Sequence, residues 1–247
     1  MEEHMKEFYI PSDNIKLHAK LELPEFEDKC PLAIVFHGLT GHMEEEHIIA
    51  AANTFVEKGI AALRVELYGH GQSEGDFSKH NLFRWINNAL DVISYVKTLD
   101  YVSDLYLCGH SQGGLLTIIV AGMKNDDFKA IIPMSPAINI VEGAKIGNFL
   151  GLEFDPVHIP DKVCFAEKEL DGDYLRVAQM IDVDQLISRY KGKVLITHGD
   201  EDEAVPLAVS LEAAKKYSDC KPVIIKGDDH CYTRHLDEVV EAIRDFI

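Results

Sequence analysis

The chain carries the segment Asp104-Leu105-Tyr106-Leu107-Cys108-Gly109-His110-Ser111-Gln112-Gly113-Gly114 near its centre. Residues 104–108 form an apolar, β-rich run that predicts a buried strand, and residues 114–123 have helical periodicity. Between them, Gly109 to Gly113 match G-x-S-x-G, a sharp strand-to-helix turn that exposes a serine. We therefore predict Ser111 to be a nucleophile at the carboxyl edge of a sheet, beside a helix N-terminus.

A second match to the same pattern, Gly71-Gln72-Ser73-Glu74-Gly75, lacks that context. The strand expected before it ends near Leu67, and the polar residues Glu74, Asp76, Ser78 and Lys79 follow as they would in a loop. Because the turn needs a strand directly before it and a helix directly after it, Ser73 is expected in a solvated turn.

Strand-like and helix-like segments alternate on both sides of Ser111. Strands are expected at 32–36, 60–67, 104–108, 129–134, 193–197 and 221–226, and helices at 45–58, 82–99, 114–123, 206–216 and 236–247. Residues 7–11 and 16–23 are expected to form a hairpin around Ser12, Asp13 and Asn14. This order predicts one α/β domain over residues 1–247, with a mostly parallel twisted sheet, an N-terminal antiparallel hairpin and helices on both faces.

One connection is longer than the fold requires. Residues 136–192 separate two expected strands, whereas a βαβ crossover needs only about 10 to 12 residues. The segment has helix-like stretches at 141–150 and 174–188, interrupted by Asp155-Pro156, Ile159-Pro160 and Asp171-Gly172. We expect a small inserted cap over the strand ends at approximately 136–192.

Composition and charge restrict the partners. With 24 Lys and Arg against 42 Asp and Glu, the net charge of -18 repels nucleic acid and anionic membranes, so a small neutral substrate is favoured. No apolar run approaches the roughly 18 residues of a membrane span, and residues 1–7 lack a signal-peptide core. The five cysteines, and His37, His42 and His47, have no metal-ligand spacing. We expect a cytoplasmic protein without metal or cofactor, and a homodimer is left open.

A nucleophilic serine needs a base and an acid that orients the base. Among the 12 histidines, His230 alone lies between the last expected strand and the last expected helix, so we predict it to be the base. The acid is expected in the loop after the strand at 193–197. Asp200 and Asp202 both fit that position, and position alone does not separate them.

Ester cleavage also needs backbone N–H groups that stabilise the developing oxyanion. Gln112 directly follows the nucleophile and should provide one. The loop at 37–42 should provide the other from Leu39, because Gly38 and Gly41 on either side allow the backbone to turn.

Five motifs in this order resemble the α/β-hydrolase superfamily along nearly the whole chain. They are His37-Gly38, Gly69-His70-Gly71-Gln72-Ser73, Gly109-His110-Ser111-Gln112-Gly113, His198-Gly199 with Asp202 and Val205-Pro206, and Gly227-Asp228-Asp229-His230. In that superfamily the acid lies four residues before the position of Pro206, so the resemblance selects Asp202. It implies the α/β-hydrolase fold and a cofactor-free Ser111, His230 and Asp202 triad.

The segments Gly109–Gly114, His158-Ile159-Pro160-Asp161 and Tyr174–Gln179 resemble bacterial cinnamoyl (feruloyl) esterases. These are intracellular enzymes with a small cap that hydrolyse hydroxycinnamoyl esters. The resemblance implies that Tyr174 faces the phenolic end of the substrate. Where some members place an acidic partner for that phenol, this chain has Gly143 with Glu142 adjacent. Tyr174, Glu142 and His37 are the candidate substrate contacts.

The predicted function is hydrolysis of small aromatic esters through an acyl-enzyme. A monoacylglycerol-type lipase or thioesterase would use the same machinery, and only relative activities separate them. A non-catalytic ligand receptor on this fold is a further alternative, which a complete triad disfavours. A haloalkane dehalogenase is disfavoured because position 111 is Ser rather than Asp.

Overall fold

The computed structural model describes residues 5–247, so residues 1–4 of the segment inspected for a signal peptide lie outside the described part. An eight-stranded sheet has the order β1-β2-β4-β3-β5-β6-β11-β12. Its strands are β1 Met5–Ser12, β2 Ile15–Glu22, β3 Cys30–Phe36, β4 Ala61–Val65, β5 Val102–His110, β6 Phe128–Met134, β11 Lys193–Gly199 and β12 Cys220–Ile225. All eight strands expected from the sequence are present.

The sheet is parallel from β4 to β12 and antiparallel at its N-terminal edge, as expected. β1 and β2 are joined through Asp13 and Asn14, whose φ angles of 44° and 63° are those of the tight hairpin turn that Asn and Asp favour. β2 then pairs antiparallel with β4, so the hairpin extends the parallel sheet at one edge.

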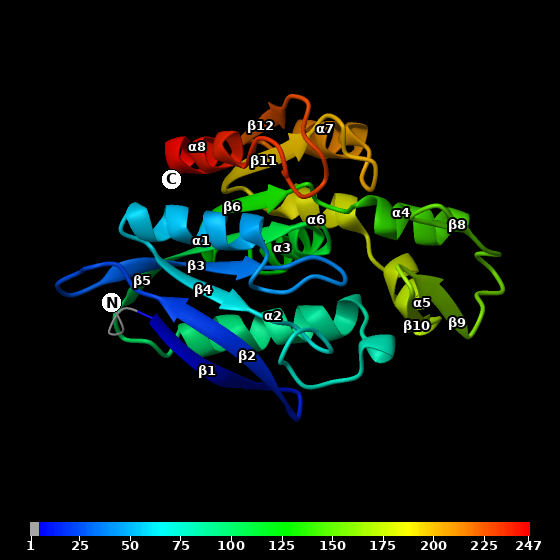
Figure 1. Cartoon of the computed structure of the whole chain (residues 1–247), viewed down its shortest axis with the longest axis horizontal. Helices are drawn as coiled ribbons and strands as arrows, with labels where there is room; N and C mark the ends of the chain where they lie inside the picture. The colour runs from blue at the N-terminus through cyan, green and yellow to red at the C-terminus, as the bar shows by residue number, and fades with distance from the viewer. Residues whose placement is uncertain (1–4) are drawn as a thin grey trace.

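Helices cover both faces of the sheet (Figure 1). α1 (Glu46–Glu57) and α8 (Leu236–Phe246) pack together on one face, where Ile48, Phe55 and Ile243 are buried. On the other face lie α2 (Leu82–Val96), α3 (Gln112–Met123), α6 (Val183–Arg189) and α7 (Leu207–Lys216). α3 is apolar around its whole circumference and nearly all of it is buried, because α2 and α6 flank it.

The long connection between β6 and β11 contains more elements than the sequence indicated. They are α4 Asn139–Ile146, β7 Asn148–Phe149, β8 Leu152–Glu153, β9 Lys162–Phe165, β10 Lys168–Asp171, α5 Asp173–Gln179 and α6. The single helix expected at 174–188 is wrong: Asp182 accepts a hydrogen bond from Gln185 N and starts α6 as a new helix. The two short hairpins, β7–β8 and β9–β10, were not anticipated.

α6 packs against α3 and serves as the crossover helix between β6 and β11, within the body of the fold. The elements from α4 to α5 project beyond the body, at the right of Figure 1. This projecting part corresponds to the greater part of the cap expected from the sequence, and we propose that it acts as one.

Candidate active site

Ser111 occupies the junction where β5 ends and α3 begins. Its backbone has φ 55° and ψ -117°, a strained conformation for a residue with a side chain. Hydrogen bonds maintain that conformation: Ser111 N donates to Met134 O at 2.9 Å, and Ala137 N donates to Ser111 O at 3.0 Å. The strand, turn and helix expected around Ser111 are therefore all present.

Glycines allow α3 to approach the sheet closely at this turn. A Cβ on Gly109 would lie 2.4 Å from Gly113 O, and a Cβ on Gly113 would lie 2.4 Å from His37 O. Both distances are far below van der Waals contact, so a larger residue would displace the helix start and Ser111 with it.

His230 and Asp202 form a hydrogen-bonded pair, with His230 Nδ1 2.7 Å from Asp202 Oδ2. The other carboxylate oxygen, Asp202 Oδ1, accepts from the backbone N–H groups of Ala204 at 2.9 Å and Val205 at 2.8 Å. The Asp202 side chain is wholly buried. The geometry therefore brings Asp202, the residue that the resemblance selected, to His230.

Asp200 has a different environment. It accepts a hydrogen bond from Gly227 N at 2.7 Å and so connects the loops that follow β11 and β12.

Burial raises the pKa of Asp202, but hydrogen bonds from His198 and His230 outweigh this effect and hold that pKa well below its usual range. Because Asp202 is ionised near neutral pH, His230 Nδ1 carries a proton, and Nε2 can act as the base.

The loop that carries His230 is held by hydrogen bonds to the ends of neighbouring strands. His110 Nε2 donates to His230 O at 2.7 Å. Tyr232 is buried, and its hydroxyl lies 2.8 Å from Ser135 Oγ and 3.0 Å from Thr197 Oγ1. These contacts tie the loop to the strand ends beneath it.

Ser111 and His230 border the same cavity of about 220 Å³. Its lining also includes Leu39, Glu45, Ile140, Leu150, Phe165, Ala204, Val205 and Cys231. Within residues 5–247, Ser111 Oγ has no hydrogen-bond partner, so its bond to His230 Nε2 is not formed in this structure. Such bonds often tighten only when substrate binds.

Two backbone N–H groups near Ser111 are unpaired. Neither Leu39 N nor Gln112 N has a hydrogen-bond partner among the described residues. The Leu39 turn is closed by Gly41 N donating to Gly38 O at 3.2 Å. Within this turn, Thr40 rather than either glycine adopts a positive φ, of 64°.

His37 does not reach the cavity, so the expectation that it contacts substrate was wrong. It is wholly buried, with Nδ1 donating to Gly38 O at 2.8 Å and Nε2 accepting from Leu67 N at 3.1 Å. Burial lowers the pKa of His37 to about 3, so the ring is neutral. It is a core residue that ties the loop after β3 to the loop after β4.

Tyr174 is also placed differently from the expectation. It is wholly buried beside Phe149 and His80, and its hydroxyl donates to Gln112 Oε1 at 2.6 Å. The phenol is therefore used within the protein rather than presented to the cavity. The sequence contained no signal for this contact, because Tyr174 and Gln112 are far apart along the chain.

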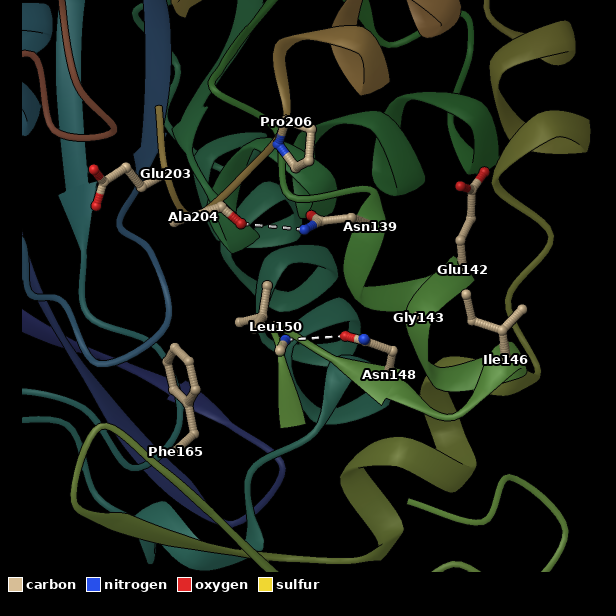
Figure 2. A pocket seen from close by; sticks show the side chains of 11 residues that line it. Asn139, Glu142, Gly143, Ile146, Asn148, Leu150, Phe165, Glu203, Ala204 and Pro206 are labelled. Atoms are coloured by element: carbon tan, nitrogen blue, oxygen red, sulfur yellow. Dashed lines mark hydrogen bonds between the residues drawn. The ribbon is translucent and has the colours of Figure 1, made fainter. Parts of the chain in front are cut away.

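Glu142 lies in an adjoining hollow of about 640 Å³ (Figure 2). The hollow is lined by Asn139, Glu142, Gly143, Ile146, Asn148, Leu150, Gly151, Phe165, Glu203, Ala204 and Pro206, of which Leu150, Phe165 and Ala204 also line the cavity at Ser111. Figure 2 shows Asn139 bonded to Ala204 O, at 3.3 Å, across one side. Sequence reasoning missed Leu150 and Phe165, because a tight turn and a four-residue cap strand have no periodicity to mark which residues face a cavity.

Ser73 is not the solvated residue that was expected. It is 8% exposed, its Oγ donates to Glu66 O at 2.6 Å, and it accepts from His18 N at 2.8 Å. It is a buried structural serine that joins the loop after β4 to β2.

Within residues 5–247, no group of three or more His, Cys, Asp or Glu side chains is arranged to hold a metal ion. No helix in that range combines the length and apolar character needed to cross a bilayer.

Comparisons with known proteins agree with this architecture. Residues 28–161 match the family model described as serine aminopeptidase, S33. A structure of Est1E from Butyrivibrio proteoclasticus with ferulic acid bound is 50% identical, covers 97% of both chains and has a TM-score of 0.95. A second Est1E structure is 48% identical, covers 97% of this chain and 96% of its own, and has a TM-score of 0.91.

Mouse alpha/beta hydrolase domain-containing protein 10 shares the fold, at 18% identity, 97% coverage of each chain and a TM-score of 0.78. A search of curated proteins found no match. The chain therefore belongs to the α/β-hydrolase superfamily, within the serine aminopeptidase S33 family, and it is similar to Est1E over almost its full length.

Proposed function

We propose that this protein is a serine esterase that cleaves small aromatic esters, in particular hydroxycinnamoyl (feruloyl) esters, through Ser111, His230 and Asp202. The observation that carries the proposal is the hydrogen bond between His230 and the buried Asp202 carboxylate, beside a cavity that Ser111 also borders. Ferulic acid bound to Est1E supports the choice of acyl group.

In the proposed reaction each of these groups has one role. His230 Nε2 takes the proton of Ser111 Oγ as Oγ attacks the ester carbonyl, and Asp202 stabilises the resulting imidazolium. The oxyanion faces the unpaired N–H groups of Leu39 and Gln112, each worth roughly 3 to 4 kcal/mol in comparable sites. His230 then protonates the leaving alcohol. A water molecule, deprotonated by His230, then attacks the acyl-enzyme, and Ser111 Oγ takes the proton back from His230 as the carboxylic acid leaves.

The substrate preference rests on the hollow beside the cavity. Ile146, Leu150 and Phe165 give it an apolar lining that suits a flat aromatic acyl group. Glu142 is the polar side chain that we propose meets the far end of that group. We place the enzyme in the cytoplasm, because all five cysteines are free thiols.

The test compares kcat/KM for methyl ferulate, a medium-chain monoacylglycerol and an acyl-CoA. We expect methyl ferulate to be preferred and Ser111→Ala to abolish its hydrolysis. Asp202→Asn should lower kcat by on the order of 10³ to 10⁴-fold. The neighbouring Asp200→Asn is the matched control and should stay near wild type. A higher kcat/KM for the glyceride or thioester would reject the substrate class, and an active Ser111→Ala variant would reject the mechanism.

A further inference from the structure

We propose that His198 is a positioning residue for the esterase reaction, which holds the Asp202 carboxylate in the orientation that His230 requires. This inference rests on the proposed function, because His198 would act only through Asp202 and His230.

His198 lies near the end of β11 and is 1% exposed. Its Nε2 lies 2.8 Å from Val205 O and 3.1 Å from Asp202 Oδ2, and its Nδ1 lies 2.7 Å from Ser210 Oγ. Because both partners of Nε2 are acceptors, Nε2 carries the proton. In the neutral ring, Nδ1 then accepts from the Ser210 hydroxyl, which α7 supplies.

Asp202 Oδ2 therefore lies between two imidazole rings: it is hydrogen-bonded to His230 Nδ1 at 2.7 Å and lies 3.1 Å from His198 Nε2. The backbone N–H groups of Ala204 and Val205 occupy Oδ1. With three hydrogen bonds in fixed directions and the His198 Nε2–H group 3.1 Å from Oδ2, the carboxylate cannot rotate about its Cβ–Cγ bond without losing several of these contacts. His198 also binds Val205 O, so one ring fixes both the acid and the loop that carries it.

Removing His198 has two predictable effects. The carboxylate gains freedom to turn, so His230 spends less time in the reactive orientation and kcat falls. The Asp202 charge is then no longer stabilised by the His198 Nε2–H group 3.1 Å away, so it stabilises the protonated form of His230 more strongly. The acidic limb of the kcat/KM profile should therefore move to higher pH.

Other titratable groups around His230 are unchanged by this substitution. Glu45 from the start of α1 borders the same cavity, and the His110 ring from β5 packs against His230 in a tilted arrangement, with ring centroids 4.7 Å apart. The His47 ring of α1 packs against His110 in turn, also tilted. A shift of the acidic limb would therefore report on the Asp202 side of His230.

The experiment measures kcat, KM and the pH profile for methyl ferulate in His198→Ala, His198→Gln and Ser210→Ala. We expect His198→Ala to lower kcat about tenfold or more, with KM nearly unchanged and the acidic limb at higher pH. Gln can present an amide N–H near the Nε2 position, so His198→Gln should recover part of kcat and return the limb toward wild type. Ser210→Ala, which leaves the Nε2 contacts intact, should show the same changes more weakly.

Thr54→Val is the control for lost stability. Thr54 is 1% exposed and its hydroxyl donates to Ala50 O within α1, so removal of the hydroxyl should lower the melting temperature without altering the pH profile. The proposal is overturned if His198→Ala keeps the wild-type kcat and the acidic limb of its kcat/KM profile does not move. It is also overturned if His198→Ala and His198→Gln lose the same kcat and neither moves the acidic limb. An active Asp202→Asn variant would instead reject the proposed function itself.

Discussion

Tyr174→Phe separates two roles for the cap tyrosine, a contact with substrate and a contact within the protein. The hydroxyl donates to Gln112 Oε1 at 2.6 Å, and both side chains are wholly buried. Within the described residues, Gln112 Nε2 already lacks a partner, so the substitution would leave the whole side-chain amide unpaired. An unpaired buried acceptor costs about 1 to 3 kcal/mol. For a chain of this size, that corresponds to a fall of about 2 to 12 °C in melting temperature.

The assay combines urea unfolding with the ratio of kcat/KM for methyl ferulate and methyl 3,4-dimethoxycinnamate, which lacks the free 4-hydroxyl. We expect lower stability and a lower kcat, because Gln112 also carries a candidate oxyanion N–H, but an unchanged ratio. Tyr217→Phe is the matched control: the Tyr217 hydroxyl is buried without a partner among the described residues, so its removal should cost little. Unchanged stability would refute this reasoning. So would a fall of about fivefold in the ratio of kcat/KM for the two esters, which is the change expected from losing a contact worth about 1 kcal/mol with the substrate phenol.

Two further predictions concern the backbone at Ser111 and the charge in the cavity. Gly113→Ala should cost about 1 to 3 kcal/mol and lower kcat, because its Cβ would meet His37 O at 2.4 Å. Gly59→Ala, which meets nothing within 4 Å, should cost only about 1 kcal/mol for its φ of +77° and leave kcat unchanged; equal kcat losses would contradict this explanation. Burial raises the pKa of Glu45, which borders the cavity with His230. Glu45→Gln removes an anion that favours protonated His230, so the acidic limb of kcat/KM should move to lower pH; a shift to higher pH would show that Glu45 acts otherwise.

The strands and the main helices could be predicted because their patterns are local. β5, the glycine turn and α3 are consecutive in the sequence, so the strand-to-helix turn at Ser111 was visible in eleven residues. The order of the motifs and their resemblance to a known superfamily then placed His230 and Asp202. The cap was harder, because its strands are two to four residues long and carry no periodicity.

The sequence by itself determined the α/β class, the order of the candidate triad residues along the chain and the position of the strand-to-helix turn at Ser111. Chain connectivity and the hydrophobic period suffice for these. Only the tertiary structure decided what each polar group faces. His37 and Tyr174 were expected at the substrate but have their hydrogen bonds satisfied inside the protein, whereas His198 lies 3.1 Å from Asp202 Oδ2. The physical reason is that a buried hydrogen bond depends on which groups meet across strands and loops, and residue spacing along the chain does not specify that.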